Sequence, residues 1–245
     1  MQNKAIWVAS KYECHNNKWR ASRDRQQVSI GSRLISDITA NWYAHCIPQY
    51  VKGSLLDLGC GQVPFFGMYR DYISDNICVD WGGSPHGNIY LDMEHDLTQP
   101  LPFVDNSFDT IILSDVLEHI AEPMSLFSEM YRVLNKGGKI IINVPFFYCM
   151  HECPHDYYRY TEFALKRFAE KSNFKVILLE TSGGSIEIFS DLFAKHIQFL
   201  PIIGNFFANL AQGISFLISK TKLGSYIKKN TDKAFPFGYF LVLEK

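Results

Sequence analysis

The sequence has no surplus of charge of either sign. In 245 residues, 24 lysines and arginines stand against 25 aspartates and glutamates. Proteins that hold a nucleic-acid backbone usually present a broad positive field. We therefore expect no nucleic-acid partner and favour a small or neutral substrate.

Paired cysteine spacings and a leader segment are also missing. The six cysteines follow no zinc-ribbon or disulfide pattern: Cys14, Cys46, Cys60, Cys78, Cys149 and Cys153. The first residues include Lys4, Lys11 and Glu13 and contain no apolar core like that of a signal peptide. Repeats and low-complexity tracts are absent. These absences predict reduced thiols and a cytoplasmic location.

Apolar residues are plentiful, at 47%, which is enough for one α/β core in a chain of this length. Between Ile30 and Trp42 they recur at helical spacing, and this leading helix is expected to run until Pro48. We therefore divide the chain into an N-terminal helical segment, 1–50, and a main domain, 51–245.

From Ser54 onward, short apolar runs bounded by Gly, Pro, Asn and Asp alternate with helical stretches, as buried parallel strands and crossover helices do. The expected strands are 54–58, 77–80, 89–92, 110–113, 139–144, 175–180 and 239–243. A helix over 124–134 is expected to end at Gly137-Gly138. Right-handed crossovers then give a Rossmann-like, doubly wound α/β sheet with its ligand site at the carboxyl ends of the strands.

The first strand ends in an acid and two glycines, in the run Leu55-Leu56-Asp57-Leu58-Gly59-Cys60-Gly61. Glycine lets the backbone approach a ligand closely. A dinucleotide site would want a third glycine where Pro64 stands, so a cofactor without phosphates is favoured.

S-adenosylmethionine has a cationic sulfonium, a zwitterionic end and an adenosine, and a site for it wants acids and carbonyls. Asp80 closes the second strand, where a carboxylate can take up two ribose hydroxyls. Trp81 would cover the adenine, and Asp96 would accept from its amino group. Each residue alone also fits an ordinary turn or packing role, so the prediction depends on their joint order.

Further motifs follow in the same order along the chain: Cys78-Val79-Asp80, Asp96-Leu97, Leu101-Pro102-Phe103, Asp105 to Asp109, Val116-Leu117-Glu118-His119 and Tyr131 to Gly138. Together with residues 55–61 they resemble the class I S-adenosylmethionine-dependent methyltransferases of the small-molecule type. The resemblance runs from about 55 to 144 and implies a seven-stranded sheet with a terminal antiparallel strand. One departure is Val63, where the family often has a glycine.

The resemblance also implies roles for the cofactor site. The loop with Asp57, Gly59, Cys60 and Gly61 would lie under the methionine moiety, and Asp80 would bind the ribose. Asp96 and Leu97 would lie beside the adenine, next to Trp81. Ser114 and Asp115 would face the methionine end.

The loop after the fifth strand is dense in titratable and aromatic groups, and such loops carry chemistry. Methyl transfer to a hydroxyl needs alignment and a base. We expect His155 or His151 as the base, Asp156 to orient its imidazole, and Arg159 to hold the acceptor. The alternative is that these residues only tie the loop down.

We expect no metal. His151, Cys153, His155 and Asp156 are crowded into one loop without an evident distant ligand. Glu118 and His119 are expected to shape the pocket floor.

The stretch 151–160 also looks like a subgroup found among glycan and surface-polysaccharide biosynthesis enzymes. That resemblance suggests O-methylation of a small or glycan-type acceptor. Two other readings stay open: a non-catalytic cofactor-binding or scaffold protein, and a nicotinamide-dependent oxidoreductase, which Pro64 disfavours.

A segment of about fifty residues, 185–233, is inserted before the last strand. It is expected to form one or two amphipathic helices, with five lysines and no acid between Leu192 and Lys229. We favour a lid or homodimer surface, because most amphipathic helices bury their apolar face in protein. Peripheral contact with the inner face of a membrane stays open.

Overall fold

The computed structural model describes residues 1–83 and 89–245, and the chain forms two compact units. Unit 1 comprises Met1–Val8, Cys46–Glu180 and Tyr239–Lys245, and unit 2 comprises Ala9–His45 and Thr181–Gly238. Unit 1 contains the central sheet and every residue expected to bind cofactor or acceptor.

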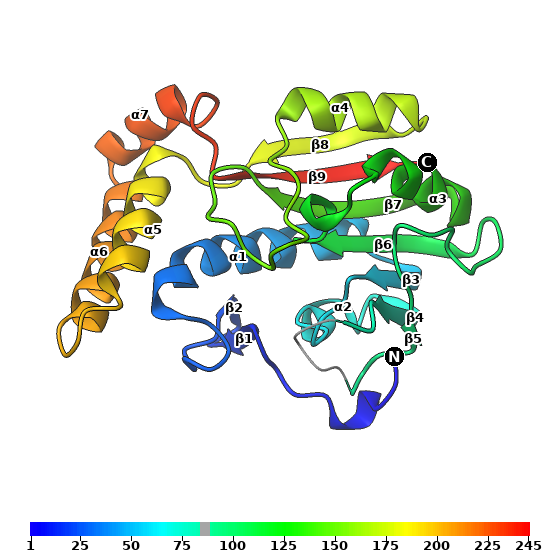
Figure 1. Ribbon diagram of the computed structural model, residues 1–245, viewed down its shortest axis with the longest axis horizontal. Helices are drawn as coiled ribbons and strands as arrows, with labels where there is room; N and C mark the ends of the chain where they lie inside the picture. The colour runs from blue at the N-terminus through cyan, green and yellow to red at the C-terminus, as the bar shows by residue number, and fades with distance from the viewer. Residues whose placement is uncertain (84–88) are drawn as a thin grey trace. The chain divides into compact units, whose positions relative to one another are not determined.

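The central sheet has seven strands in the order β5-β4-β3-β6-β7-β9-β8 (Figure 1). The strands are β3 Gly53–Leu58, β4 Ile73–Asp80, β5 Met93–Glu94, β6 Phe108–Ser114, β7 Leu134–Pro145, β8 Lys175–Thr181 and β9 Gly238–Glu244. Strands β5 to β7 pair in parallel, and Figure 1 shows β9 running opposite to β7 and β8. The predicted Rossmann-like sheet with an antiparallel last strand is confirmed.

Both faces of this sheet are covered. Ile111 and the helix residue Phe127 belong to one apolar cluster, while Ile112, which points to the opposite face, is equally buried. Strands covered on both faces need apolar residues at every position, which explains the continuous runs in the sequence. The helices of this unit are α2 Phe66–Tyr69, α3 Pro123–Val133 and α4 Glu162–Lys171, with 3-10 turns η1 Lys4–Ile6 and η3 Leu117–His119.

The expected strand over 89–92 is wrong, because β5 begins only at Met93. Two backbone carbonyls of that run already have other partners. The Ile89 carbonyl accepts from the Asn3 amide at 2.7 Å, and the Tyr90 carbonyl accepts from the Gln2 N–H at 3.2 Å. The run therefore packs against the start of the chain and does not extend the sheet.

Two helix ends also differ from expectation. Helix α3 passes directly into β7, so Gly137-Gly138 lies within a strand and does not cap the helix. Gly137, with φ 78°, donates to the Lys245 carbonyl at 2.9 Å, so the pair joins the end of β9. Helix α1, Arg33–Tyr50, continues for two residues past Pro48, since a proline in the last turn removes only one hydrogen bond.

Unit 2 contains a hairpin that the sequence analysis did not anticipate. Strands β1, Tyr12–His15, and β2, Lys18–Ala21, pair antiparallel. Asn16 and Asn17 between them both adopt positive φ, 50° and 57°, the geometry of a tight hairpin turn.

The inserted segment forms three helices in the described residues, α5 Ser185–Ile197, α6 Gly204–Ser219 and α7 Lys222–Thr231. Two glutamines fasten it within unit 2 near the 3-10 turn η2, Ile30–Ser32. The Gln212 carboxamide oxygen accepts from the Leu34 N–H at 3.1 Å, and that of Gln198 accepts from the Gly31 N–H at 3.0 Å. In the described parts of the chain, no helix has the length and apolar character needed to cross a bilayer.

Candidate functional site

The glycine loop leaves β3 where two segments come close together. Gly59 has φ 67°, and a Cβ there would lie 2.3 Å from Cγ2 of Val116, which follows β6. The N–H groups of Gly59 and Cys60 both donate to the Val79 carbonyl, at 2.8 and 3.1 Å. Glycine is therefore required at position 59 by backbone conformation and by space.

Asp80, at the end of β4, holds this loop in place. Its buried carboxylate accepts from the Gly61 N–H at 2.9 Å and from the Trp81 N–H at 2.8 Å. The structure thus brings Gly61, Asp80 and Trp81 together at the carboxyl edge of the sheet.

Two further members of the expected cofactor set, Asp57 in β3 and Cys60 in the loop after it, are buried. Asp57 accepts from the Tyr69 hydroxyl at 3.1 Å, and burial raises its pKa to about 7. A hydrogen bond with Cys78, together with burial, raises the pKa of the Cys60 thiol, which keeps it protonated. Both side chains are buried, so they stabilise the loop from inside unit 1.

Val63 keeps a glycine-like backbone. It is fully buried, with φ 50°, at the position where the resembling family often has glycine. A β-branched residue in this region is strained by roughly 1–2 kcal/mol. Val63 therefore adopts, at some cost in strain, the backbone conformation that a glycine adopts easily.

Asp96 and Leu97 follow β5. The Asp96 carboxylate accepts from the Thr98 N–H and hydroxyl at 2.9 and 2.8 Å, and these bonds lower its pKa. Leu97 lies in the core of unit 1. Both have the local roles that the sequence allowed as an alternative.

The end of β6 presents a strained acid. Asp115, directly after Ser114, has φ 53°, and its carboxylate accepts from the Asn143 side-chain amide at 2.5 Å. Backbone strain of this kind is concentrated at functional sites. Asn143, buried in β7, was missed by the sequence analysis, and a polar residue within an apolar strand was the signal that could have found it.

The loop 146–161 is tied to the segment around η3. The N–H groups of Tyr157 and Tyr158 donate to the Glu118 carbonyl at 2.9 and 3.3 Å. The Tyr158 and Tyr160 hydroxyls donate to the carbonyls of Ala121 and Leu117, at 2.8 and 3.0 Å. The expected acceptor loop therefore has a fixed path beside the carboxyl ends of β6 and β7.

Of the two histidines that Asp156 was expected to orient, the structure places His151 beside it. The Asp156 carboxylate binds both terminal nitrogens of Arg159 at 2.6 and 2.8 Å and lies 3.4 Å from His151 Nδ1. The Arg159 guanidinium holds the pKa of Asp156 well below its usual range. Arg159 also donates to the Cys149 carbonyl at 3.1 Å, so it fastens the loop.

His155 instead faces Trp81. The two rings are 5.4 Å apart, edge to face, and His155 Nδ1 lies 3.1 Å from the Tyr157 hydroxyl. Trp81 is 44% exposed. This contact joins the expected cofactor segment to the expected acceptor loop.

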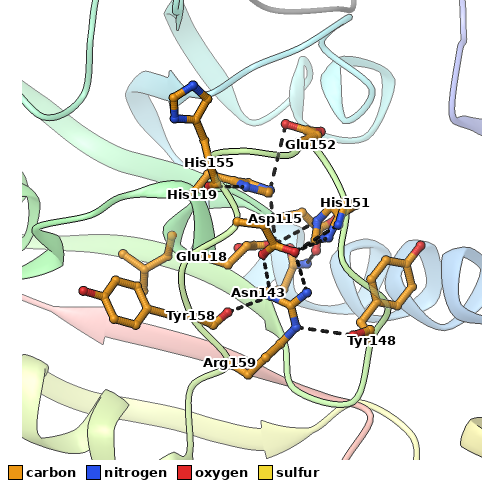
Figure 2. A network of polar contacts seen from close by, with 12 residues as sticks. Asp115, Glu118, His119, Asn143, Tyr148, His151, Glu152, His155, Tyr158 and Arg159 are labelled. Carbon is orange, nitrogen blue, oxygen red and sulfur yellow. Dashed lines mark hydrogen bonds and ion pairs between the residues drawn. The ribbon is translucent and has the colours of Figure 1, made fainter.

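A third group of side chains lies between β6 and the loop (Figure 2). The fully buried Glu118 carboxylate has His151 Nε2 at 3.6 Å and His119 Nε2 at 3.8 Å. Burial raises the pKa of Glu118. Burial is also the largest single influence on His151 and opposes its protonation, but the Glu118 and Asp156 carboxylates and the Cys149 carbonyl together raise the pKa of His151. The sequence could not show that Glu118 and His119 meet His151.

The carboxyl edge of the sheet lies in the part of the chain that resembles known proteins. Residues 56–142 match the methyltransferase domain family. The matched segment runs from β3 to β7 and contains the glycine loop, Asp80, Asp115 and Glu118. The domain match, together with the fold, implies S-adenosylmethionine as the cofactor.

Individual relatives differ in what their names say they act on. A tRNA U34 carboxymethyltransferase of Sulfurimonas denitrificans is 25% identical over 81% of this chain and 75% of its own length. A demethylmenaquinone methyltransferase of Alkalihalophilus pseudofirmus is 23% identical over 56% of this chain, which spans only 43% of that relative. Among solved structures, an S-adenosylmethionine-dependent methyltransferase from Archaeoglobus fulgidus has the same fold, with TM-score 0.53, 16% identity and coverage of 83% of this chain and 91% of its own.

Proposed function

We propose that the chain is an S-adenosylmethionine-dependent methyltransferase that methylates an oxygen of a small or glycan-type acceptor. The single observation that carries the proposal is the contact of Trp81 with His155, 5.4 Å between ring centroids. It brings the segment after Asp80 and the loop 146–161 together at the edge where α/β sheets bind ligands.

The chemistry of the edge fits this cofactor. Gly59 and Gly61 leave the backbone bare, and Asp80 and Asp115 give the edge negative charge, which suits a cationic sulfonium. Bound S-adenosylmethionine would supply an activated methyl group. Asp80 would bind the ribose, Trp81 would cover the adenine, and the loop after β3 with Asp115 would hold the methionine end.

The protein's own task is then to align the acceptor and remove its proton. We assign His155 as the base, because its imidazole is exposed beside Trp81. His151 is turned toward Glu118 and Asp156. Tyr157, whose hydroxyl lies 3.1 Å from His155 Nδ1, would orient the ring.

A small or glycan-type acceptor is supported by the charge balance and by the loop's resemblance to glycan-modifying enzymes. Since one relative is named for tRNA and another for demethylmenaquinone, the acceptor panel must include these classes. Mass spectrometry should find a gain of one methyl group on a nucleotide sugar, a lipid-linked glycan or a small hydroxy acid. Methylation of tRNA alone would contradict the proposed acceptor class.

Two titrations separate the competing functions. S-adenosylhomocysteine should bind, and NAD should not. Binding of NAD alone would favour an oxidoreductase, whereas S-adenosylhomocysteine binding with no methylated product across the panel would favour a scaffold.

Two variants test the assigned roles. Asp80→Ala should abolish S-adenosylhomocysteine binding in calorimetry. His155→Ala should keep that binding and lower turnover by about 10²–10⁴-fold, the usual contribution of a general base. Normal turnover by His155→Ala would remove His155 from the mechanism.

We also propose that helices α5 and α6 provide a lid or homodimer surface, with peripheral contact with a membrane as the alternative. Phe189, Phe206, Leu210 and Leu217 are 73, 65, 45 and 65% exposed. Scattered exposed apolar residues need no explanation, but several of them on two helices that pack together suggest an interaction surface. The lysines of α7 would favour anionic lipid.

A further inference from the structure

The group formed by the buried Glu118 and the half-buried His119 and His151 has no role in the proposed transfer. One ligand atom from each residue lies within 4.8 Å of the others. Neither Glu118 carboxylate oxygen nor His119 Nε2 has a hydrogen-bond partner among the described residues, although all three atoms are buried. Buried polar atoms without partners are rare in native proteins and ask for an explanation.

The two imidazoles are oriented with the same nitrogen inward. His119 Nδ1 lies 3.0 Å from the His155 backbone carbonyl, and His151 Nδ1 lies 3.3 Å from the Cys149 carbonyl. A carbonyl can only accept, so each Nδ1 carries the hydrogen. In the neutral rings both Nε2 lone pairs then point at the Glu118 carboxylate.

This pattern is typical of metal-binding histidines. Such residues usually donate their second ring N–H to a carbonyl or carboxylate, which fixes the ring and the tautomer. For His151 the Asp156 carboxylate, 3.4 Å from Nδ1, is a further partner. A carboxylate and two lone pairs would repel one another unless a cation lies among them.

The spacing is close to that of a coordination sphere. A tetrahedral zinc ion with bonds of about 2.0–2.1 Å holds its ligand atoms roughly 3.4 Å apart. Glu118 Oε1 lies 3.6 Å from His151 Nε2 and 3.8 Å from His119 Nε2. A proton could join only two of these atoms, whereas a metal ion could join all three once their separations, which reach up to 4.8 Å, close to about 3.4 Å.

We propose that Glu118, His119 and His151 bind a divalent transition-metal ion of the zinc type. Two imidazoles and one carboxylate suit zinc, while magnesium prefers oxygen ligands alone. Glu152, whose carboxylate lies 3.9 Å from His119 Nε2, is placed to approach a fourth position. The ion binds regardless of methyl transfer; only its use, to select acceptors with an anionic or hydroxyl oxygen, rests on the proposed function.

Metal binding by the purified, chelator-treated protein tests the site directly. Zn²⁺ should bind at about one ion per chain in elemental analysis after dialysis. Co²⁺ should bind in its place and give visible absorption bands, which Zn²⁺ then removes. Mg²⁺ in excess should not displace either ion. A metal content near zero, with S-adenosylhomocysteine binding intact in the same sample, would overturn the metal site and leave the proposed function untouched.

Variants locate the ion. Glu118→Gln, which keeps the shape of the side chain, and His151→Ala should each weaken Zn²⁺ binding by at least about tenfold. His155→Ala is the matched control in the same loop and should bind Zn²⁺ as the wild type does, because His119 contacts only its backbone carbonyl. If Glu118→Gln does not fold, as judged by circular dichroism, His151→Ala decides. Equal Zn²⁺ affinity in His151→Ala and His155→Ala would overturn the proposal.

Discussion

Asp57 is a carboxylate that folding removes from water. It is 3% exposed, and its main stabilising contact is the Tyr69 hydroxyl. With Asp80 nearby adding repulsion, its pKa lies near 7. Asp57 therefore takes up a proton on folding at moderately acidic pH. Its charged form destabilises the folded protein at higher pH.

The raised pKa of Asp57 should make the stability of the protein depend on pH. The folded pKa of Asp57, about 7, exceeds the unfolded value near 3.9, so its contribution to stability falls as pH rises from about 4 to about 7. Asp57→Asn should equal the wild type near pH 4 and exceed it above pH 8, by at most about 4 kcal/mol. Urea unfolding at several pH values measures the difference; a constant difference across pH would contradict it.

Single residues also show where sequence reasoning stops. The order Asp57, Gly59, Gly61 and Asp80 was legible because a strand end and a tight turn are local features. The meeting of Glu118 with His151 was not legible, since it depends on the path of a loop after β7. The fold of that loop likewise decides that Asp156 lies beside His151 and Arg159, a choice between His151 and His155 that the sequence left open.

Among the elements, α3 is fixed to the loop before β6 by one side chain. The Arg132 guanidinium donates to the carbonyls of Leu101 and Phe103 at 2.8 and 2.7 Å. It also binds Glu129 at 2.7 Å and Asp105 at 2.9 Å. A planar fork can satisfy all these acceptors at once, and an ammonium cannot.

Substitutions of Arg132 and of Lys166 should therefore change the free energy of unfolding by different amounts. Arg132→Lys should lower the free energy of unfolding by about 1–3 kcal/mol, because several acceptors lose their donor. Lys166→Gln, on α4, breaks an exposed pair with Glu162 and should change it by less than about 0.5 kcal/mol. Urea unfolding measures both variants. A loss as small in Arg132→Lys, which keeps the charge, as in Lys166→Gln would show that the hydrogen bonds of Arg132 add nothing beyond its charge.

At the level of elements, most of the sheet could be predicted, and the errors share one cause. The strands with unbroken apolar runs were found because burial on both faces imposes that pattern. The segment 89–92 has the same pattern but gives its carbonyls to Gln2 and Asn3. Gly137-Gly138 looked like a helix end but pairs with the end of the chain at Lys245. Partners distant in sequence decided both cases.

The protein as a whole has two compact units, and large apolar side chains are exposed on both. Unit 1 exposes large apolar side chains at positions far apart in the sequence, such as Val104, Met150 and Phe163. Unit 2 leaves large side chains of α5 and α6 exposed, Ile202 between them fully so. The sequence predicted an amphipathic insertion, but its use remains a proposal.

Liposome flotation of the purified protein tests that surface. If the surface contacts a membrane, the protein should float with anionic vesicles at low salt and less at high salt, because lysines flank the apolar helix. The double variant Phe206→Ser, Leu217→Ser should lose flotation and keep S-adenosylhomocysteine binding. Failure of the wild type to float would exclude the membrane contact and leave a lid or a homodimer surface, and sedimentation would detect the homodimer.

The attachment of the loop 146–161 to η3 has a thermodynamic consequence. Because Tyr157, Tyr158 and Tyr160 already donate to main-chain carbonyls, the loop is ordered before any acceptor arrives. Acceptor binding then freezes few new torsions, so its entropic penalty should be small and its association rate close to that of a rigid pocket. The amide hydrogens of Tyr157 and Tyr158 should exchange slowly with solvent in the ligand-free protein.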